Sequence, residues 1–426
     1  MTNPLRIIVT GLIAQHHQLG GVAWDYLQYP AGLARLGHDV YYIEDSGEWP
    51  YNTDGGPTGN DWVAHDCTPN VRHLADVMDR FGLKDRWAYH FPIDSTWYGL
   101  SDATRKEVIA TADLLINVSG TIEHPENYRQ VPCLVYVDSD PVFTQIKLAL
   151  GMDEFSKRVD THDVHMTFGE HFSGAVPRTR HLWRPTRQPI LLAEWRTDRL
   201  CRDAFTTVMS WTSYKPLEFR GQAYGQKDLE LVRFLKLPAR LKATPLEIAL
   251  SSTHHVNWEL VDSAAGIGLS LTGKPTPSEL LAAAGWRVVD PDHVCGDLDS
   301  YRSYVETSKG EWSVAKNGYV KGQAGWFSCR SACYLAAGRP VVAQDTGFPP
   351  VIPVGEGLFA FETLEQAAAA IEEIEGNYKR HSEAARAIAE EYFDSGKVLT
   401  KLIEDILQGD RTSGSHSTQH SELKTS

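Results

Sequence analysis

The chain has 426 residues, of which 42% are hydrophobic, so it can bury a large core, and its length favours two or more domains. It carries 41 Lys and Arg against 55 Asp and Glu, a formal net charge of -14, and it has no block rich in Lys and Arg. Because binding to a nucleic-acid backbone needs concentrated positive charge, nucleic acid is not expected as the main partner.

The chain shows no segment typical of membrane insertion. Its N-terminus has only a brief apolar run with polar residues after it, which is typical of neither a signal peptide nor a spanning helix, and no later segment is long and apolar enough to span a bilayer. Six scattered cysteines lack paired metal spacings, so we expect free thiols in the cytoplasm. Cys329 and Cys333, four residues apart on one predicted helix, suit a core role better than metal or redox work.

The first elements predict a βαβ unit. Residues 6–10 form a short β-branched strand, residues 22–38 have helical spacing, and residues 39–45 form a second strand. Gly20 and Gly21 stand at the start of the helix, where backbone N–H groups can bind a diphosphate. No G-x-G-x-x-G motif is present, although Glu44 stands where an acid that binds ribose is expected.

Two further buried strands, residues 113–118 and 133–137, end in polar clusters. Because the carboxyl ends of parallel strands meet at one crevice, these clusters and the first loop supply candidates for a general base. The three that we single out are His17, Asp138 and Asp140. Asp140 precedes Pro141 and a predicted helix, so it suits an N-cap equally well, and His17 also suits a solvated loop.

A stretch rich in Arg and Pro, residues 178–189, predicts a domain boundary that ends near Trp195. A new strand at residues 206–211 then repeats the opening of the first domain. Lys215, Arg220 and Lys227 lie before the helix at residues 228–237, and three cations near a helix start suit a diphosphate. Lysines on the surface near a helix start are also common, so this reading stays open.

Residues 325–347 read as a loop, a short apolar helix, a turn at Gly338 and a buried strand. Ser328 is a candidate N-cap, and the free N–H groups of the first helical turn and a guanidinium face the same way. We therefore predict diphosphate contacts from Ser328, Arg330 and Ser331. The strand delivers its following loop to the ligand edge of the sheet, which predicts sugar contacts from Asp345, Thr346 and Gly347.

The last part of the chain reads as a strand at residues 355–361 followed by helices, the first capped by Thr363. We expect domains at residues 1–195 and 196–390 and a C-terminal helix at residues 391–408. The sequence leaves open whether this helix crosses back to the N-terminal domain. Residues 409–426 are rich in Ser, Thr, Gly and His and predict a disordered tail, not a metal site.

Residues 338–371, GRPVVAQDTGFPPVIPVGEGLFAFETLEQAAAAI, resemble the C-terminal half of glycosyltransferases of the GT-B fold. In that fold a Gly-Pro-Val-Val turn and strand precede a polar loop, a G-E-G-L strand and a helix that begins near T-x-E-x-A. Residues 33–44, LARLGHDVYYIE, are more loosely similar to the opening of the same fold.

The resemblance implies an α/β chain with two Rossmann-like domains, whose parallel sheets face an interdomain cleft. It implies a nucleotide-sugar donor held mainly by residues 196–390 and a small-molecule or glycan acceptor held by residues 1–195. The expected activity is that of a hexosyltransferase that uses a UDP, GDP or dTDP sugar and needs no metal or other cofactor.

The sequence also departs from the family. Many retaining members carry two Glu residues at positions that align here with Gly325 and Cys333, so the stereochemistry of transfer stays undecided. Three other functions remain: a sugar-nucleotide epimerase of the same fold, a sugar- or nucleotide-binding protein without catalysis, and a nicotinamide oxidoreductase. The missing G-x-G-x-x-G motif argues against the last of these.

Overall fold

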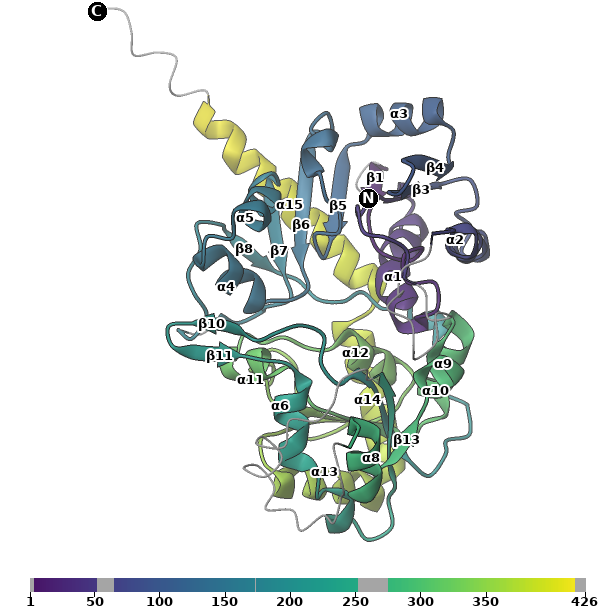
Figure 1. Ribbon diagram of the computed structural model, residues 1–426, viewed down its shortest axis with the longest axis vertical. Coiled ribbons are helices and arrows are strands. Elements are labelled where there is room, and N and C mark those ends of the chain that lie inside the picture. The colour runs from purple at the N-terminus through teal and green to yellow at the C-terminus, as the bar shows by residue number, and fades with distance from the viewer. Residues whose placement is uncertain (1–3, 52–64, 173, 252–274, 418–426) are drawn as a thin grey trace, which may run out of the picture.

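A computed structural model describes residues 4–51, 65–172, 174–251 and 275–417. Figure 1 shows two domains stacked along the long axis of the molecule, each with its own sheet. Within the described residues, no helix is both long and apolar enough to cross a membrane.

The N-terminal domain is built on an eight-stranded sheet in the order β4-β3-β2-β1-β5-β6-β7-β8. Every neighbouring pair is parallel except β3 and β4. The strands are β1 Arg6–Val9, β2 Asp39–Glu44, β3 Trp87–Phe91, β4 Thr96–Gly99, β5 Leu114–Val118, β6 Cys133–Asp138, β7 Val164–Thr167 and β8 Trp183–Pro185. Strands β5 and β6 are buried along their whole length, as expected for parallel strands covered on both faces.

Helices cover this sheet, and they are α1 Gly20–Arg35, α2 Thr68–Arg80, α3 Asp102–Thr111, α4 Phe143–Ala149 and α5 Asp153–Asp160. The antiparallel β3–β4 hairpin extends the sheet at one edge and was not predicted from the sequence. Short edge strands carry too few alternating residues to give a clear period.

The C-terminal domain has a six-stranded, wholly parallel sheet in the order β13-β12-β9-β14-β15-β16. Its strands are β9 Phe205–Ser210, β12 Leu246–Ser251, β13 Arg287–Val289, β14 Gly310–Ser313, β15 Val341–Gln344 and β16 Leu358–Phe361. Its helices are α6 Lys227–Leu231, α8 Pro277–Ala283, α9 Pro291–Cys295, α10 Leu298–Thr307, α11 Asn317–Gly322, α12 Cys329–Ala336, α13 Leu364–Gly376 and α14 Tyr378–Tyr392. A separate antiparallel hairpin, β10 Leu217–Phe219 with β11 Gln222–Tyr224, follows β9.

The two domains share one apolar core where α1 meets α10 and α12. Trp24, Tyr301 and Cys333 belong to the same buried cluster, and the Trp24 indole Nε1 donates to the Leu298 carbonyl oxygen at 2.9 Å. A second buried cluster, which includes the β12 residues Leu246, Ile248 and Leu250, belongs to the C-terminal domain alone. The α1 side of the interface is therefore packed like a domain interior.

The last helix, α15 Ser395–Ser417, runs back across the N-terminal domain (Figure 1). The Ile190 N–H donates to the Phe393 carbonyl oxygen at 2.7 Å, and Leu399 packs so closely on α1 that a Cβ at Gly32 would stand 2.5 Å from it. The helix continues through Ser417, and the rest of the predicted tail lies outside the described residues.

Candidate functional site

A cavity of about 260 Å³ lies between the domains, at the carboxyl ends of β9 and β12 and opposite the start of α1. The N-terminal domain contributes Leu19, Gly21, Val22, Asp25 and Tyr51. The C-terminal domain contributes Val208, Met209, Ser210, Lys227, Ser251, Pro291, Asp292, Cys295, Tyr301 and Arg330. Ligands of open parallel sheets bind at such strand ends.

The start of α1 forms one wall. Leu19 stands at the N-cap and makes no side-chain capping bond, so the first N–H groups of the helix stay available. Gly20 is required by packing, because a Cβ there would stand 2.0 Å from the Asp297 carbonyl oxygen. Gly21 and Val22 therefore present the positive end of a 16-residue helix to the cavity.

Arg330 forms the facing wall from the second residue of α12. Its Nε donates to Glu311 Oε1 at 2.5 Å and its guanidinium also donates to the Val208 carbonyl oxygen at 2.6 Å. Burial acts to lower the pKa of Arg330, but the Glu311 carboxylate raises it above the ordinary value. The guanidinium is thus a fixed positive charge held in place from two sides.

Lys227, the first residue of α6, lines the same cavity. Among the described residues its ammonium has neither a hydrogen-bond nor an ion-pair partner. Burial, with the Arg330 charge nearby, lowers the pKa of Lys227 well below its ordinary value. An anion bound between these two cations would supply the missing partner.

Asp25 is a cavity residue that sequence analysis missed. It lies one helical turn after Gly21, on the same face of α1, and burial raises the pKa of its carboxyl to about 7 although Arg330 opposes the shift. Its carboxylate has no partner within the described part of the chain. The i, i+4 spacing to Gly21 was the available signal, once the helix start was placed at Gly20.

Asp138, one predicted base, is enclosed by its own domain. It accepts hydrogen bonds from Thr144 Oγ1 at 2.7 Å, Gln145 Nε2 at 2.9 Å and Thr167 Oγ1 at 2.9 Å. Burial raises its pKa to about 6, against these hydrogen bonds. The geometry gives this carboxylate a role in joining β6, α4 and β7.

Asp140, the second predicted base, reaches across to the other domain. It accepts from Lys316 Nζ at 2.8 Å, from the Tyr214 hydroxyl at 2.9 Å and from the Tyr319 hydroxyl. Asp140 was also a candidate N-cap of the helix that follows it, but Val142 is the N-cap of α4. Burial acts to raise the pKa of Asp140, but Lys316 and the hydroxyls hold it below its usual value.

His17, the third predicted base, lies in the loop before α1 and outside the lining of the cavity. Its Nδ1 lies 3.1 Å from Asn70 Nδ2, and its ring meets His73 edge to face at 6.5 Å. Glu44 also has a local role, because it accepts from the backbone N–H groups of Ala14 at 2.8 Å and Gln15 at 2.6 Å. It shapes the loop that leads into α1 and does not face the cavity.

The structure separates the three predicted cations of the C-terminal domain. Lys227 lines the interdomain cavity, whereas Lys215 and Arg220 are exposed and absent from its lining. Arg220 stands at the tip of the β10–β11 hairpin, which sequence analysis did not predict. The hairpin carries this side chain to another cavity.

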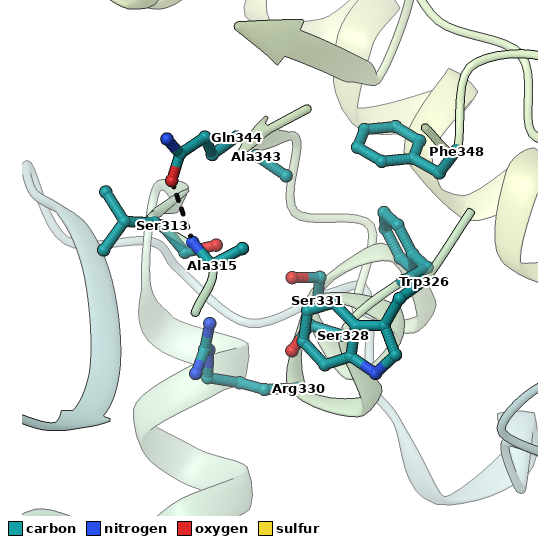
Figure 2. Close-up of a pocket in the computed structure, with 11 residues that line it drawn as sticks. Ser313, Ala315, Trp326, Ser328, Arg330, Ser331, Ala343, Gln344 and Phe348 are labelled. Carbon is teal, nitrogen blue, oxygen red and sulfur yellow. Dashed lines mark hydrogen bonds between the residues drawn. The ribbon is translucent and has the colours of Figure 1, made fainter. Parts of the chain in front are cut away.

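Ser328 and Ser331 line a much smaller pocket of about 10 Å³ with Arg330 (Figure 2). Ser328 is the N-cap of α12 by position, although its side chain makes no capping bond. Ser331 is fully buried, and its Oγ has no hydrogen-bond partner among the described residues. Figure 2 shows the Arg330 side chain pointing away from Trp326 and Phe348.

The predicted sugar loop is tied to the segment before α12. Asp345 accepts from the Gly347 N–H at 2.7 Å, and the Thr346 hydroxyl donates to the Trp326 carbonyl oxygen. A Cβ at Gly347 would stand 2.7 Å from the Gln323 carbonyl oxygen. None of the three residues lines the interdomain cavity as the described residues define it.

Several solved structures have the same architecture. An alpha-glucosyltransferase in complex with UDP and a 13-mer DNA matches with a TM-score of 0.54 and 11% identity, over 95% of this chain and 100% of that chain. HepE from Anabaena, in complex with UDP and glucose, matches with a TM-score of 0.52 and 12% identity, over 95% and 100%. AviGT4, a glycosyltransferase involved in Avilamycin A biosynthesis, matches with a TM-score of 0.50 and 11% identity, over 95% and 98%.

No protein-family model and no curated protein matches the sequence. At these identities the structural likeness shows the fold. The chain has the GT-B fold of two facing Rossmann-like domains, and the predicted fold class is confirmed.

Proposed function

We propose that the protein is a glycosyltransferase that moves a sugar from a nucleoside-diphosphate donor to a small-molecule or glycan acceptor. The observation that carries the proposal is the interdomain cavity, where Arg330, the start of α1 and Lys227, which has no ion-pair partner among the described residues, face one another. This arrangement suits a diphosphate, because it offers two cations and free N–H groups to the same anion.

Two similar structures of this fold contain UDP, and one of them also contains glucose. We therefore expect a UDP sugar as the donor. Because fold alone does not carry function, the likeness supports only the choice of UDP, and the cavity of this chain supports the transfer.

The chemistry follows from the charges. When the bond between the sugar and the diphosphate breaks, negative charge grows on the leaving phosphate oxygen, and Lys227, Arg330 and the α1 start stabilise it. The bound anion raises the pKa of Lys227, so the lysine carries its proton when the donor is bound. Because side chains supply the positive charge, we propose that the transfer needs no metal ion.

Asp25 faces the same cavity from the domain proposed to hold the acceptor. We propose that its carboxyl group binds hydroxyl groups beside the diphosphate. His17, Asp138 and Asp140 stay candidates for positioning the acceptor, although each already has a partner in the structure.

The test is donor binding by calorimetry, with UDP and UDP-glucose as probes. Lys227→Met removes one cation and leaves no partner unpaired among the described residues, so the fold should persist while affinity falls by about tenfold or more. Lys215→Met removes an equal charge outside the cavity and is the matched control. Arg330→Ala alone would strand the buried Glu311 carboxylate, so the better variant is Arg330→Gln with Glu311→Gln.

Two results would contradict the proposal. One is the failure of the parent protein to bind any uridine, guanosine or thymidine diphosphate sugar. The other is a Lys227→Met variant that binds UDP as the parent does. Donor turnover that persists in EDTA supports the metal-free mechanism, and turnover lost in EDTA and restored by Mg²⁺ overturns it.

A further inference from the structure

The β10–β11 hairpin of the C-terminal domain lies beside α4 of the N-terminal domain (Figure 1). A second concave region lies at this place, and α5 and the loop between β7 and β8 also line it. It consists of a cavity of about 760 Å³ and an adjoining cavity of about 410 Å³. The two share Ala149, Arg178, Thr179 and His181. We call the pair the hairpin groove.

The larger cavity is positively charged. Arg178 and Arg220 line it, both side chains are exposed, and neither makes an ion pair within the described part of the chain. None of the described residues that line this cavity is Asp or Glu. In a chain of net charge -14, two uncompensated guanidinium groups on one concave surface suit an anionic ligand.

The backbone at Arg220 supports a binding role independently. The hairpin turn consists of Arg220 with φ +51° and Gly221 with φ +73°. Two-residue turns of this left-handed kind favour Asn-Gly, so an arginine in the first position carries backbone strain. Strained residues whose side chains face a cavity are a mark of functional sites.

Aromatic side chains form the walls between the arginines. The Arg220 guanidinium lies 5.1 Å from the centre of the Phe219 ring, and Trp183 is held by its Nε1, which donates to Thr179 Oγ1 at 2.8 Å. Phe172 also lines the cavity and is 36% exposed. Flat apolar faces beside guanidinium groups suit a ligand that combines rings with negative charges.

The smaller cavity differs in charge. Asp160 pairs with Arg180 and accepts from His181 Nε2 at 2.8 Å, so the Arg180 charge is compensated. Asp153 and Ser156 complete a polar wall. The groove therefore runs from a cationic, aromatic half to a polar half, which suits an extended chain better than a flat lipid surface.

We propose that the hairpin groove binds an acidic saccharide chain. Arg178 and Arg220 bind its carboxylate, sulfate or phosphate groups, and Phe219 and Trp183 contact its rings. This site is separate from the interdomain cavity, and the proposal does not depend on the proposed transfer reaction.

The test uses an octamer of α-1,4-linked galacturonate as the probe, with maltooctaose as its neutral counterpart, and calorimetry at about 50 mM NaCl. The double variant Arg178→Gln with Arg220→Asn removes both cations, and Asn suits the left-handed turn, so the fold is preserved. The matched control is Arg72→Gln with Lys84→Gln, two exposed cations on and after α2. Thermal unfolding of each variant verifies the fold.

We expect the parent and the control to bind the galacturonate octamer at least about tenfold more tightly than maltooctaose, and the double variant to lose this preference. The proposal is overturned if the parent does not bind the octamer, or if the control loses as much affinity as the double variant. It is also overturned if the double variant loses binding only to phosphatidylglycerol vesicles, because the groove would then be a lipid headgroup site.

Discussion

Lys316 Nζ of the C-terminal domain donates to Asp140 Oδ1 of the N-terminal domain at 2.8 Å. The ammonium also lies 5.2, 5.0 and 5.3 Å from the ring centres of Phe143, Tyr214 and Tyr319. Aromatic faces and a carboxylate thus enclose one charge at the junction of the domains. The pair joins the segments that precede α4 and α11, and these two helices lie on the side of the molecule opposite α9 and α10 (Figure 1).

Replacing Lys316 by Met should destabilise the protein. We expect a loss of about 1–3 kcal/mol, below the value of about 3–5 kcal/mol for fully buried pairs, because the two side chains are 20% and 29% exposed. Urea unfolding of Lys316→Met, Asp140→Asn and the double variant measures the coupling. Strictly additive losses would show that the pair contributes nothing as a pair.

The same pair gives a pH dependence. Its partners hold the pKa of Asp140 below the ordinary carboxyl value, so its stabilising effect is complete above that value and is lost as pH falls through the lowered pKa. Acid unfolding of Lys316→Met should therefore begin at a higher pH than in the parent. An unchanged midpoint would contradict this expectation.

Asp25 should act in the opposite direction. Its pKa in the folded protein is raised from 3.8 to about 7. Asp25 therefore costs no free energy of unfolding below pH 3.8, where it is protonated in both states, and it destabilises the folded protein increasingly as pH rises toward 7. Asp25→Asn should gain stability over the parent, and the gain should be larger at pH 8 than at pH 4. Denaturant unfolding at both values is the measurement, with the exposed Asp153→Asn as the control. Equal differences at both values would refute the assignment.

Gly20 tests the contact between α1 and α10. A Cβ at this residue meets the Asp297 carbonyl oxygen at 2.0 Å, so Gly20→Ala should destabilise by about 1–3 kcal/mol through overpacking. Gly376→Ala is the control, because this helical residue has no atom within 4 Å of the added Cβ. Thermal unfolding that ranks the two variants equally would contradict the close contact.

Thiol reactivity offers a simpler measurement. Cys201 is exposed, Cys329 is partly buried and the other four cysteines are buried. Burial raises the pKa of Cys295 to about 12 and that of Cys329 well above the ordinary thiol value. We expect one rapid reaction with a disulfide reagent in the folded protein, and its disappearance in Cys201→Ser.

Local patterns in the sequence predicted much of the fold. Strands β1, β5 and β6 are short apolar runs, and residues 338–371 carry a distinctive order of turn, strand and loop. The β3–β4 and β10–β11 hairpins were missed because β4, β10 and β11 are short and partly exposed, so they lack the apolar runs that mark β1, β5 and β6. Arg220 was predicted to bind the diphosphate, but the β10–β11 hairpin carries it away from the interdomain cavity.

The residues that line the cavity were predictable only where the local sequence marks the start of a helix. Gly21, Lys227 and Arg330 each stand at a helix start, and all three line one cavity. Asp138 accepts from Thr167, 29 positions away, and Asp140 accepts from Lys316, 176 positions away, and no local pattern announces such pairings. Asp25 lies within a helix, and its spacing from Gly21 points to the cavity only once the helix start is placed at Gly20.

Helix α15 makes the N-terminal domain discontinuous in the chain. Leu399 covers the face of α1 at Gly32. During synthesis this face therefore stays exposed until the whole C-terminal domain has been made. Domains usually fold as units during synthesis, the first one first. The first domain therefore cannot complete the packing of α1 until the second domain and α15 have been synthesised.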